Sequence, residues 1–247
     1  MRLDVFFAPN QVKPADTAGR LVIIVDVLRA STTVATALGN GAKTVIPLEG
    51  PDDVITRSKE FARSQTLLAG EQKMHPITGF DLGNSPQAFT PEVVEGKTIL
   101  LTTTNGTHAL LGVQGARDIV VASYVNFTAV LAMMKVAASS NTDIAIICAG
   151  EEGSFTLEDS ACAGRYVKAI PKRATMAIND AAAASVLIEK KYGDNIAKVF
   201  KESTHGQALD AAGFGDDLAA AAEVDAYPVV PIWQDRQITK LGPERER

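Results

Sequence analysis

Cysteine is scarce in this sequence. Cys148 and Cys162 are the two cysteines among 247 residues. Two cysteines are too few for a disulfide framework, and a chain of this length can bury enough apolar surface to fold without disulfides or a structural metal. Cys148 lies in an apolar run, where a buried thiol is ordinary. We therefore predict structural cysteines and a reducing, cytoplasmic setting, and we assign any bound metal to chemistry.

Long apolar runs and basic clusters are also missing. No window approaches the roughly 18 apolar residues of a membrane-spanning helix, and the first residues lack the apolar segment of a signal peptide. The formal net charge is −5 and the pI is near 5.3. An acidic chain without a basic block is a poor match for a nucleic-acid backbone. The sequence predicts a protein that neither crosses a membrane nor binds nucleic acid.

Several common phosphate-handling motifs are absent as well. Asp26 is followed two places later by Leu28 rather than by a second aspartate, and neither cysteine has an arginine six places further on. The segment 96–98, Gly-Lys-Thr, leads into a predicted strand rather than out of one, so it is not a nucleotide-binding P-loop. These absences exclude the haloacid-dehalogenase pattern, a phosphocysteine mechanism and a nucleotide-binding P-loop.

Apolar, β-branched runs alternate with segments of helical length along the chain. Strands are predicted at 3–7, 21–27, 44–48, 66–69, 98–102, 118–122, 144–148 and 227–233. Helices are predicted at 31–38, 52–63, 105–111, 126–138 and 158–169, followed by an alanine-rich helical region, 179–223, with breaks at Gly193, Gly206 and 213–215. The alternation predicts an α/β fold with a largely parallel or mixed sheet.

The composition does not change along the chain in the way that a linker would require. We therefore expect one domain over residues 1–241, built as a single body or as two closely packed halves, and a frayed tail over 242–247. The alanine-rich helices could pack against a second copy of the chain, so a homo-oligomer is one expectation.

Polar residues follow three of the predicted strands at the points where helices begin. The three segments are 26–33, 102–107 and 149–159, and they contain carboxylates, hydroxyls and one arginine. Because open parallel sheets bind ligands beyond the carboxyl ends of their strands, we expect these segments to meet at one edge of the sheet. Each segment alone is more typical of helix capping, but three on one edge favour a functional site.

Two further regions carry groups that could join this site. Glu71 and the loop 79–86, which contains Asp81 and Asn84, follow the predicted strand 66–69. Alone, the loop is equally typical of a surface turn. Later in the chain, His205 precedes a glycine, and two carboxylates follow at 216 and 217. A lone histidine before glycine more often ends a helix than takes part in catalysis.

Together, the segments 26–33, 79–86, 102–107, 149–159 and 203–206 resemble the 2-phosphosulfolactate phosphatase family, and the likeness extends from about residue 3 to 233. The resemblance implies a three-layer α/β/α fold and magnesium-dependent hydrolysis of 2-phospho-3-sulfolactate to 3-sulfolactate and phosphate. In methane-producing archaea this step leads toward coenzyme M. Gln72 departs from the family pattern, since a basic residue is expected after Gly70-Glu71, and its loss would loosen anion specificity.

The matched motifs contain one obligate cation, Arg29, although the implied substrate carries three anionic groups. Mg²⁺ is the natural counter-charge, and we expect Asp26, Glu71 and Asp81 to hold it. Arg29 and the helix start would bind the phosphoryl oxygens, and the turn 103–107 would receive the sulfonate or the carboxylate. The predicted substrate contacts are Ser31, Thr32, Thr33, Asn84, Thr103, Asn105, Gly106 and Thr107.

The sequence leaves alternatives open both for the chemical step and for the overall function. Metal-bound water or the Asp26 carboxylate itself could attack phosphorus, and either His205 or Glu158 could move the proton. A metal-dependent phosphatase for another small anionic phosphate ester is an alternative function. A non-catalytic anion-binding protein on the same fold is a second alternative, which the number of acidic residues in the matched segments disfavours.

Overall fold

The strands form one mixed sheet. In the computed structural model, which describes residues 1–171 and 176–242, an 11-stranded sheet has the order β5-β4-β6-β3-β11-β10-β7-β2-β8-β1-β9. The α/β class predicted from the sequence is confirmed. The strands are β1 (Arg2–Phe6), β2 (Leu21–Val25), β3 (Thr44–Pro47), β4 (Thr66–Gln72), β5 (His75–Pro76), β6 (Thr98–Thr102), β7 (Asp118–Ala122), β8 (Ile144–Cys148), β9 (Ala177–Ile178), β10 (Pro231–Gln234) and β11 (Gln237–Lys240).

Most helices follow the strands as connections between them. None of the helices in the described ranges combines the length and the apolar composition that crossing a bilayer requires. The helices are α1 (Pro14–Thr17), α2 (Ala30–Gly39), α3 (Pro51–Ser58), α4 (Pro91–Val94), α5 (Gly106–Leu111), α6 (Phe127–Ser139), α7 (Leu157–Ala169), α8 (Asp180–Tyr192), α9 (Ile196–Glu202), α10 (Thr204–Ala211) and α11 (Gly215–Ala221).

The centre of the sheet is buried on both faces. Every residue of β2 and β8 is buried, and alternate side chains enter two separate cores. Ile23 and Ile146 belong to the core that includes α6 and α7, whereas Ile24 and Ile147 belong to the core that includes α2 and α5. Because both faces are covered, these strands read as continuous apolar runs. The three layers that the family resemblance implied are present.

The middle of the sheet contains an antiparallel hairpin from the end of the described chain. β10 pairs with β7, and β11 pairs with β3. The predicted strand 227–233 therefore begins too early, and β11 was not predicted. Two prolines, Pro228 and Pro231, interrupt the predicted run, and the four residues of β11 include three polar ones, so neither strand has a strong sequence pattern.

The alanine-rich region forms four helices, α8 to α11. Breaks occur near Gly193 and at 213–215, as predicted, but the predicted break at Gly206 is wrong. Gly206 lies in the first turn of α10, and the break falls at Ser203, whose hydroxyl caps α10 by accepting a hydrogen bond from Gly206 N at 3.0 Å. The predicted helix 52–63 is also shorter, since α3 ends at Ser58. The predicted frayed tail falls, beyond residue 242, outside the described residues.

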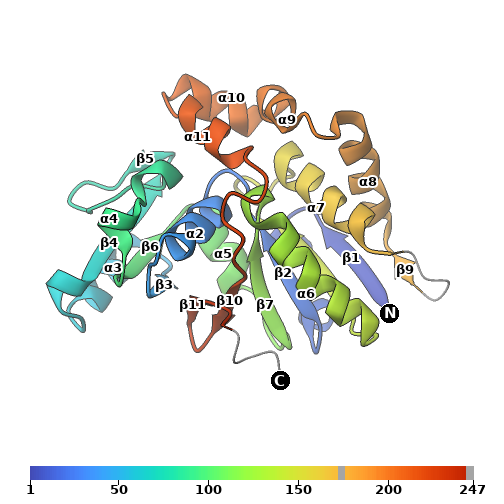
Figure 1. The fold of residues 1–247 in the computed structure, drawn as a ribbon, viewed down its shortest axis with the longest axis horizontal. Helices are drawn as coiled ribbons and strands as arrows, with labels where there is room; N and C mark the ends of the chain where they lie inside the picture. Colours follow the sequence, from blue (N-terminus) through green and yellow to red (C-terminus); the bar gives the residue numbers. More distant parts are fainter. Residues whose placement is uncertain (172–175, 243–247) are drawn as a thin grey trace.

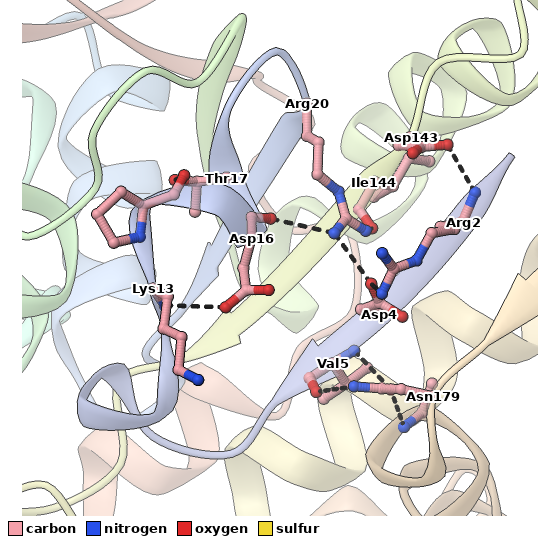
Figure 2. A network of polar contacts seen from close by, with 12 residues as sticks. Arg2, Asp4, Val5, Lys13, Asp16, Thr17, Arg20, Asp143, Ile144 and Asn179 are labelled. Carbon is pink, nitrogen blue, oxygen red and sulfur yellow. Dashed lines mark hydrogen bonds and ion pairs between the residues drawn. The ribbon is translucent and has the colours of Figure 1, made fainter.

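A buried ion pair lies at the amino ends of β1, β2 and β8 (Figure 2). Arg20 Nη1 donates to Asp4 Oδ2 at 2.9 Å and to the backbone oxygen of Asp16 at 3.0 Å, and Arg20 Nη2 donates to the backbone oxygen of Ile144. Arg2 adds a second ion pair to Asp4, at 3.0 Å. The network joins three neighbouring strands and leaves the Asp4 carboxylate fully compensated by positive charge.

The opposite end of the sheet carries the connections that follow the strands. Figure 1 shows α9 to α11 at the top of the view, at the same end as the connection between β2 and α2. Helices that are remote in sequence from the first strands therefore cover the carboxyl ends of those strands. This is the end at which an open α/β sheet binds its ligand.

Candidate active site

A cavity of about 280 Å³ lies at the carboxyl ends of the strands. Its walls come from the segments that follow β2, β4, β6 and β8, and from α10, so the strand ends meet as the sequence predicts. Its volume is suited to a small molecule rather than to a polymer. The cavity is lined by Asp26, Leu28, Arg29, Glu71, Lys73, Met74, Asn84, Thr103, Thr104, Asn105, Glu151, Glu152, His205 and Leu209.

Asp26 directly follows β2 and is buried in the cavity wall. Its Oδ1 accepts a hydrogen bond from Ala30 N at 3.2 Å, and its backbone N–H donates to Ser31 Oγ at 3.0 Å. Burial raises the pKa of Asp26 to about 6, although the positive charge of His205 partly opposes the rise. The carboxylate is therefore ionised at neutral pH but close to its titration range.

Gly106, a predicted substrate contact, instead makes room for Asp26. A Cβ atom at this position would lie 2.7 Å from Asp26 Oδ2 and 2.7 Å from Ala30 Cβ. Both distances are far shorter than real carbon contacts, so any larger residue would displace the carboxylate or the start of α2. Gly106 does not line the cavity, and its role in this structure is steric.

Glu71, near the end of β4, connects two loops of the site. Its Oε1 accepts a hydrogen bond from Thr104 N at 2.8 Å, and its Oε2 accepts one from Met74 N at 2.8 Å. The side chain is buried and lines the cavity. One carboxylate thus fixes both the hydroxyl-rich turn after β6 and the hairpin between β4 and β5.

Arg29 is held by groups from distant parts of the chain. Its Nη1 donates to Asp217 Oδ2 at 2.7 Å, and its Nη2 donates to the backbone oxygen of Met74 at 2.7 Å. Its guanidinium carbon lies 4.2 Å from the centroid of the Phe214 ring. The positive charge that the sequence analysis assigned to the phosphoryl group is therefore already balanced by a buried carboxylate on α11.

His205 and Glu158 form a buried pair. His205 Nδ1 lies 3.0 Å from Glu158 Oε1. Burial disfavours the charged imidazole, but the hydrogen bond and the negative charge of Glu158 outweigh it and raise the pKa of His205 to about 9. The imidazole is therefore protonated at neutral pH. Glu158 itself does not line the cavity and reaches it through His205.

The three predicted hydroxyl contacts at the start of α2 are not brought to the cavity wall. Ser31 Oγ accepts from Asp26 N, Thr33 Oγ1 donates to the backbone oxygen of Asn84 at 3.0 Å, and Thr32 Oγ1 donates to the backbone oxygen of Val27 at 2.7 Å. All three are buried. In this structure they fix the backbone around the site.

The turn after β6 contributes three residues to the wall: Thr103, Thr104 and Asn105. Thr107 does not line the cavity, and its hydroxyl accepts a hydrogen bond from Thr103 N at 3.1 Å, which closes the turn. Asn105 Oδ1 accepts from Glu152 N at 2.9 Å, so the turns after β6 and β8 are joined. Of the contacts predicted in this turn, Thr103 and Asn105 line the cavity, and Thr107 stabilises the turn from behind the wall.

Asp81, the third predicted metal ligand, lies away from the cavity. Its Oδ1 pairs with Arg63 Nη2 at 2.5 Å, and its Oδ2 accepts a hydrogen bond from Leu68 N at 2.8 Å. Within the described ranges, no group of three or more His, Cys, Asp or Glu side chains is placed to hold a metal ion. The predicted set of three carboxylates is therefore reduced to Asp26 and Glu71.

Asn84 supplies a further oxygen to the site. It is buried in the wall, and its Oδ1 has no hydrogen-bond partner among the described residues. A buried polar atom without a partner is uncommon in folded proteins and costs free energy unless a ligand satisfies it. Because Asn84 lines the same cavity as Asp26 and Glu71, its Oδ1 is a candidate ligand for a cation.

Several residues of the site were not predicted from the sequence. Lys73 and Met74 lie in a short hairpin, and Glu151 and Glu152 follow β8 but were not assigned a role. Asp159 is also important, because its two oxygens accept hydrogen bonds from Val27 N at 2.8 Å and Gly150 N at 3.1 Å. These bonds tie the ends of β2 and β8 together. The position of Glu151 and Glu152 beyond a strand end was the one available signal.

Comparison with known proteins agrees with the resemblance. Residues 6–236 match the family model described as 2-phosphosulpholactate phosphatase. A protein of Caldanaerobacter subterraneus is 37% identical over 231 residues, which cover 94% of this chain and 95% of that protein. A protein of Symbiobacterium thermophilum is 38% identical over 236 residues, with 93% and 98% covered. Both relatives are named probable 2-phosphosulfolactate phosphatases.

Proposed function

Because this chain belongs to the 2-phosphosulfolactate phosphatase family, we propose that it is a phosphoric monoester hydrolase that converts 2-phospho-3-sulfolactate to 3-sulfolactate and phosphate, with Mg²⁺ as cofactor. One observation carries the proposal. Asp26, Glu71 and His205, which lie far apart in the sequence, line the same small cavity at the carboxyl ends of the strands. An acidic pair and a protonated imidazole suit the cleavage of a phosphate ester.

The oxygen donors of the cavity fit Mg²⁺. Asp26 and Glu71 offer carboxylate oxygens, and Asn84 offers a buried oxygen without a partner among the described residues. Mg²⁺ prefers oxygen ligands and commonly takes one or two carboxylates together with phosphate and water. Bound there, the ion would balance the charge of the ester and polarise its phosphoryl group.

The charges of the wall support the need for a cation. Four carboxylates line the cavity, at Asp26, Glu71, Glu151 and Glu152. Arg29 and His205 are each paired with a further buried carboxylate, Asp217 and Glu158 respectively. Lys73 is the remaining basic residue of the wall, and one ammonium does not balance four carboxylates. An ester with three anionic groups would therefore meet strong repulsion in this cavity without added positive charge.

His205 is the proposed general acid. Its Nδ1 is occupied by Glu158, so we assign the reactive proton to Nε2. As the bond between phosphorus and the ester oxygen breaks, the leaving alkoxide takes this proton and the imidazole becomes neutral. Glu158 orients the ring and keeps it protonated before the step. Glu158 is thus a positioning residue in this proposal.

Asp26 serves one of two roles at the phosphorus atom. In the first, water attacks phosphorus, the ester oxygen leaves, and the proton of the attacking water passes to an Asp26 oxygen. In the second, an Asp26 oxygen attacks phosphorus, the ester oxygen leaves, and water then hydrolyses the aspartyl-phosphate. Acid quenching after mixing with labelled ester separates the two, because only the second leaves phosphate on the protein.

Phosphate release from 2-phosphosulfolactate tests the proposed function directly. We expect turnover with Mg²⁺, loss of turnover after dialysis against EDTA, and recovery when Mg²⁺ is returned. Phosphoglycolate and 2-phospholactate serve as comparison esters. Full activity in metal-free buffer would exclude Mg²⁺ as a cofactor. Faster hydrolysis of phosphoglycolate than of 2-phosphosulfolactate would indicate that the substrate is another small anionic ester.

The cellular setting follows as part of the proposal. Cys148 and Cys162 are both free and buried, which suits a reducing cytoplasm. Coenzyme M biosynthesis is the pathway suggested by the family resemblance. Accumulation of 2-phosphosulfolactate and loss of coenzyme M in cells that lack the protein would support that pathway.

A further inference from the structure

The hairpin between β4 and β5 has an unusual turn. Gln72 pairs with His75, so Lys73 and Met74 form a two-residue loop. Both have positive φ angles, 49° for Lys73 and 73° for Met74. Such turns favour Asn-Gly, because side chains with a Cβ atom are strained at positive φ. A Lys-Met turn persists only where surrounding contacts hold it in place.

The contacts that hold this turn come from the active site itself. Glu71 Oε2 accepts the Met74 N–H at 2.8 Å, and Arg29 Nη2 donates to the Met74 backbone oxygen at 2.7 Å. The His75 ring lies 6.0 Å from the Phe214 ring, on which Arg29 also packs. The hairpin is therefore a built part of the cavity, and it places Lys73 in the wall.

Lys73 differs from the other basic residues of the wall. Arg29 is paired with Asp217 at 2.7 Å and His205 with Glu158 at 3.0 Å. Lys73 is exposed, and within the described part of the chain it has neither an ion pair nor a side-chain hydrogen bond. Its ammonium is therefore a cation of the cavity whose charge no carboxylate of the described residues offsets.

We propose that Lys73 determines substrate specificity by binding the sulfonate of the ester. The inference rests on the proposed function. The phosphoryl group is assigned to the part of the wall formed by Asp26, Glu71 and His205, so a second strong anion needs a cation elsewhere. The turn at Thr103 to Asn105 offers neutral donors, whereas an ammonium forms a charge-assisted hydrogen bond, which is about twice as strong.

The test compares two esters and three variants. The esters are 2-phosphosulfolactate and 2-phospholactate, which lacks the sulfonate. Lys73→Met removes the charge but keeps an unbranched side chain, and Lys73→Arg keeps the charge. Lys59→Met is the matched control, because Lys59 is exposed, lies at the end of α3 and does not line the cavity.

We expect Lys73→Met to lower kcat/KM for the sulfonated ester by about 10- to 100-fold, chiefly through KM. The loss for 2-phospholactate should be several-fold smaller, so the ratio between the esters narrows. Lys73→Arg should restore most of the ratio, and Lys59→Met should match wild type. An unchanged ratio in Lys73→Met, or equal losses on both esters, would overturn the assignment.

A binding measurement separates this inference from the proposed function. Calorimetric titration with 3-sulfolactate needs no turnover, so it applies even if wild type hydrolyses neither ester. Weaker binding by Lys73→Met but not by Lys59→Met would support the sulfonate contact. Equal affinity of wild type, Lys73→Met and Lys59→Met would overturn it, whatever the outcome of the activity assays. Circular dichroism confirms that each variant is folded.

Discussion

Two buried aspartates, one at the amino ends of the strands and one at their carboxyl ends, differ in how their charge is compensated. Asp4, on β1, is paired with Arg20 at 2.9 Å and with Arg2 at 3.0 Å, as Figure 2 shows for the first pair. Asp26, after β2, forms no ion pair in the described ranges, and Glu71 and Glu158 add negative charge near it. Two arginines pair directly with Asp4 and stabilise the fold there, whereas the nearest cation to Asp26 is the imidazolium of His205, which is itself paired with Glu158. A buried carboxylate with so little compensation is typical of a site that binds a ligand or carries out a reaction.

The largest effect is expected when the carboxylate of Asp4 is neutralised, at the end of the sheet where Asp4 pairs with Arg20 and Arg2. Asp4→Asn leaves the buried Arg20 without its carboxylate, and we expect the free energy of unfolding to fall by about 3–5 kcal/mol. Urea denaturation followed by circular dichroism measures the change. A loss below about 1 kcal/mol would mean that the network contributes little more than an exposed pair.

The same change at Asp26, at the carboxyl ends of the strands, should lower activity rather than stability. Asp26→Asn removes both a metal ligand and a nucleophile or base, so we expect kcat to fall by about a hundredfold or more, equivalent to about 2.7 kcal/mol. The assay is phosphate release at saturating 2-phosphosulfolactate and Mg²⁺. Near-normal turnover by a folded variant would reduce Asp26 to a structural residue.

The stability of Asp26→Asn should change in the opposite direction from that of Asp4→Asn. Because the folded-state pKa of Asp26 is raised from 3.8 to about 6, its stabilising contribution is present below pH 3.8 and is lost as the pH rises through 6. At pH 7 without Mg²⁺, Asp26→Asn should therefore be more stable than wild type by about 3 kcal/mol. The difference should shrink toward pH 4, and a less stable variant at pH 7 would contradict the account.

A smaller effect is expected from a change beside Asp26. Gly106→Ala places a Cβ atom 2.7 Å from Asp26 Oδ2 and forces the carboxylate to move, so we expect kcat to fall about tenfold. Gly50→Ala is the control, because its Cβ atom would have no neighbour closer than 3.8 Å. Equal activities of the two variants would show that the Asp26 carboxylate can accommodate the added methyl group without leaving its active position.

The sequence predicted the location of the site better than its contacts. Alternating strands and helices dictate a sheet whose strand ends meet, so Asp26, Glu71 and Asn105 were expected on one edge and all line the cavity. His205 also lines it, although its helix comes late in the chain. The location of the site was predictable because the order of strands and helices follows from hydrophobic patterns along the chain.

The failures concern side-chain partners that no local pattern reveals. Asp217 lies 188 positions from Arg29, and nothing near either residue indicates their ion pair. Asp81 was assigned to the metal because its segment matches the family, but it pairs with Arg63. Lys73 was overlooked because a Lys-Met pair is not a typical hairpin turn. Such outcomes depend on long-range packing.

The central position of β10 and β11 has a consequence for synthesis on the ribosome. Residues 231–240 are made after every other strand, yet they join β3 to β7 in the middle of the sheet. A nascent chain that stops before Pro231 consists of two part-sheets, each with an unpaired inner edge. Open edges of this kind invite pairing with other chains, so the growing polypeptide needs protection until its last hairpin emerges.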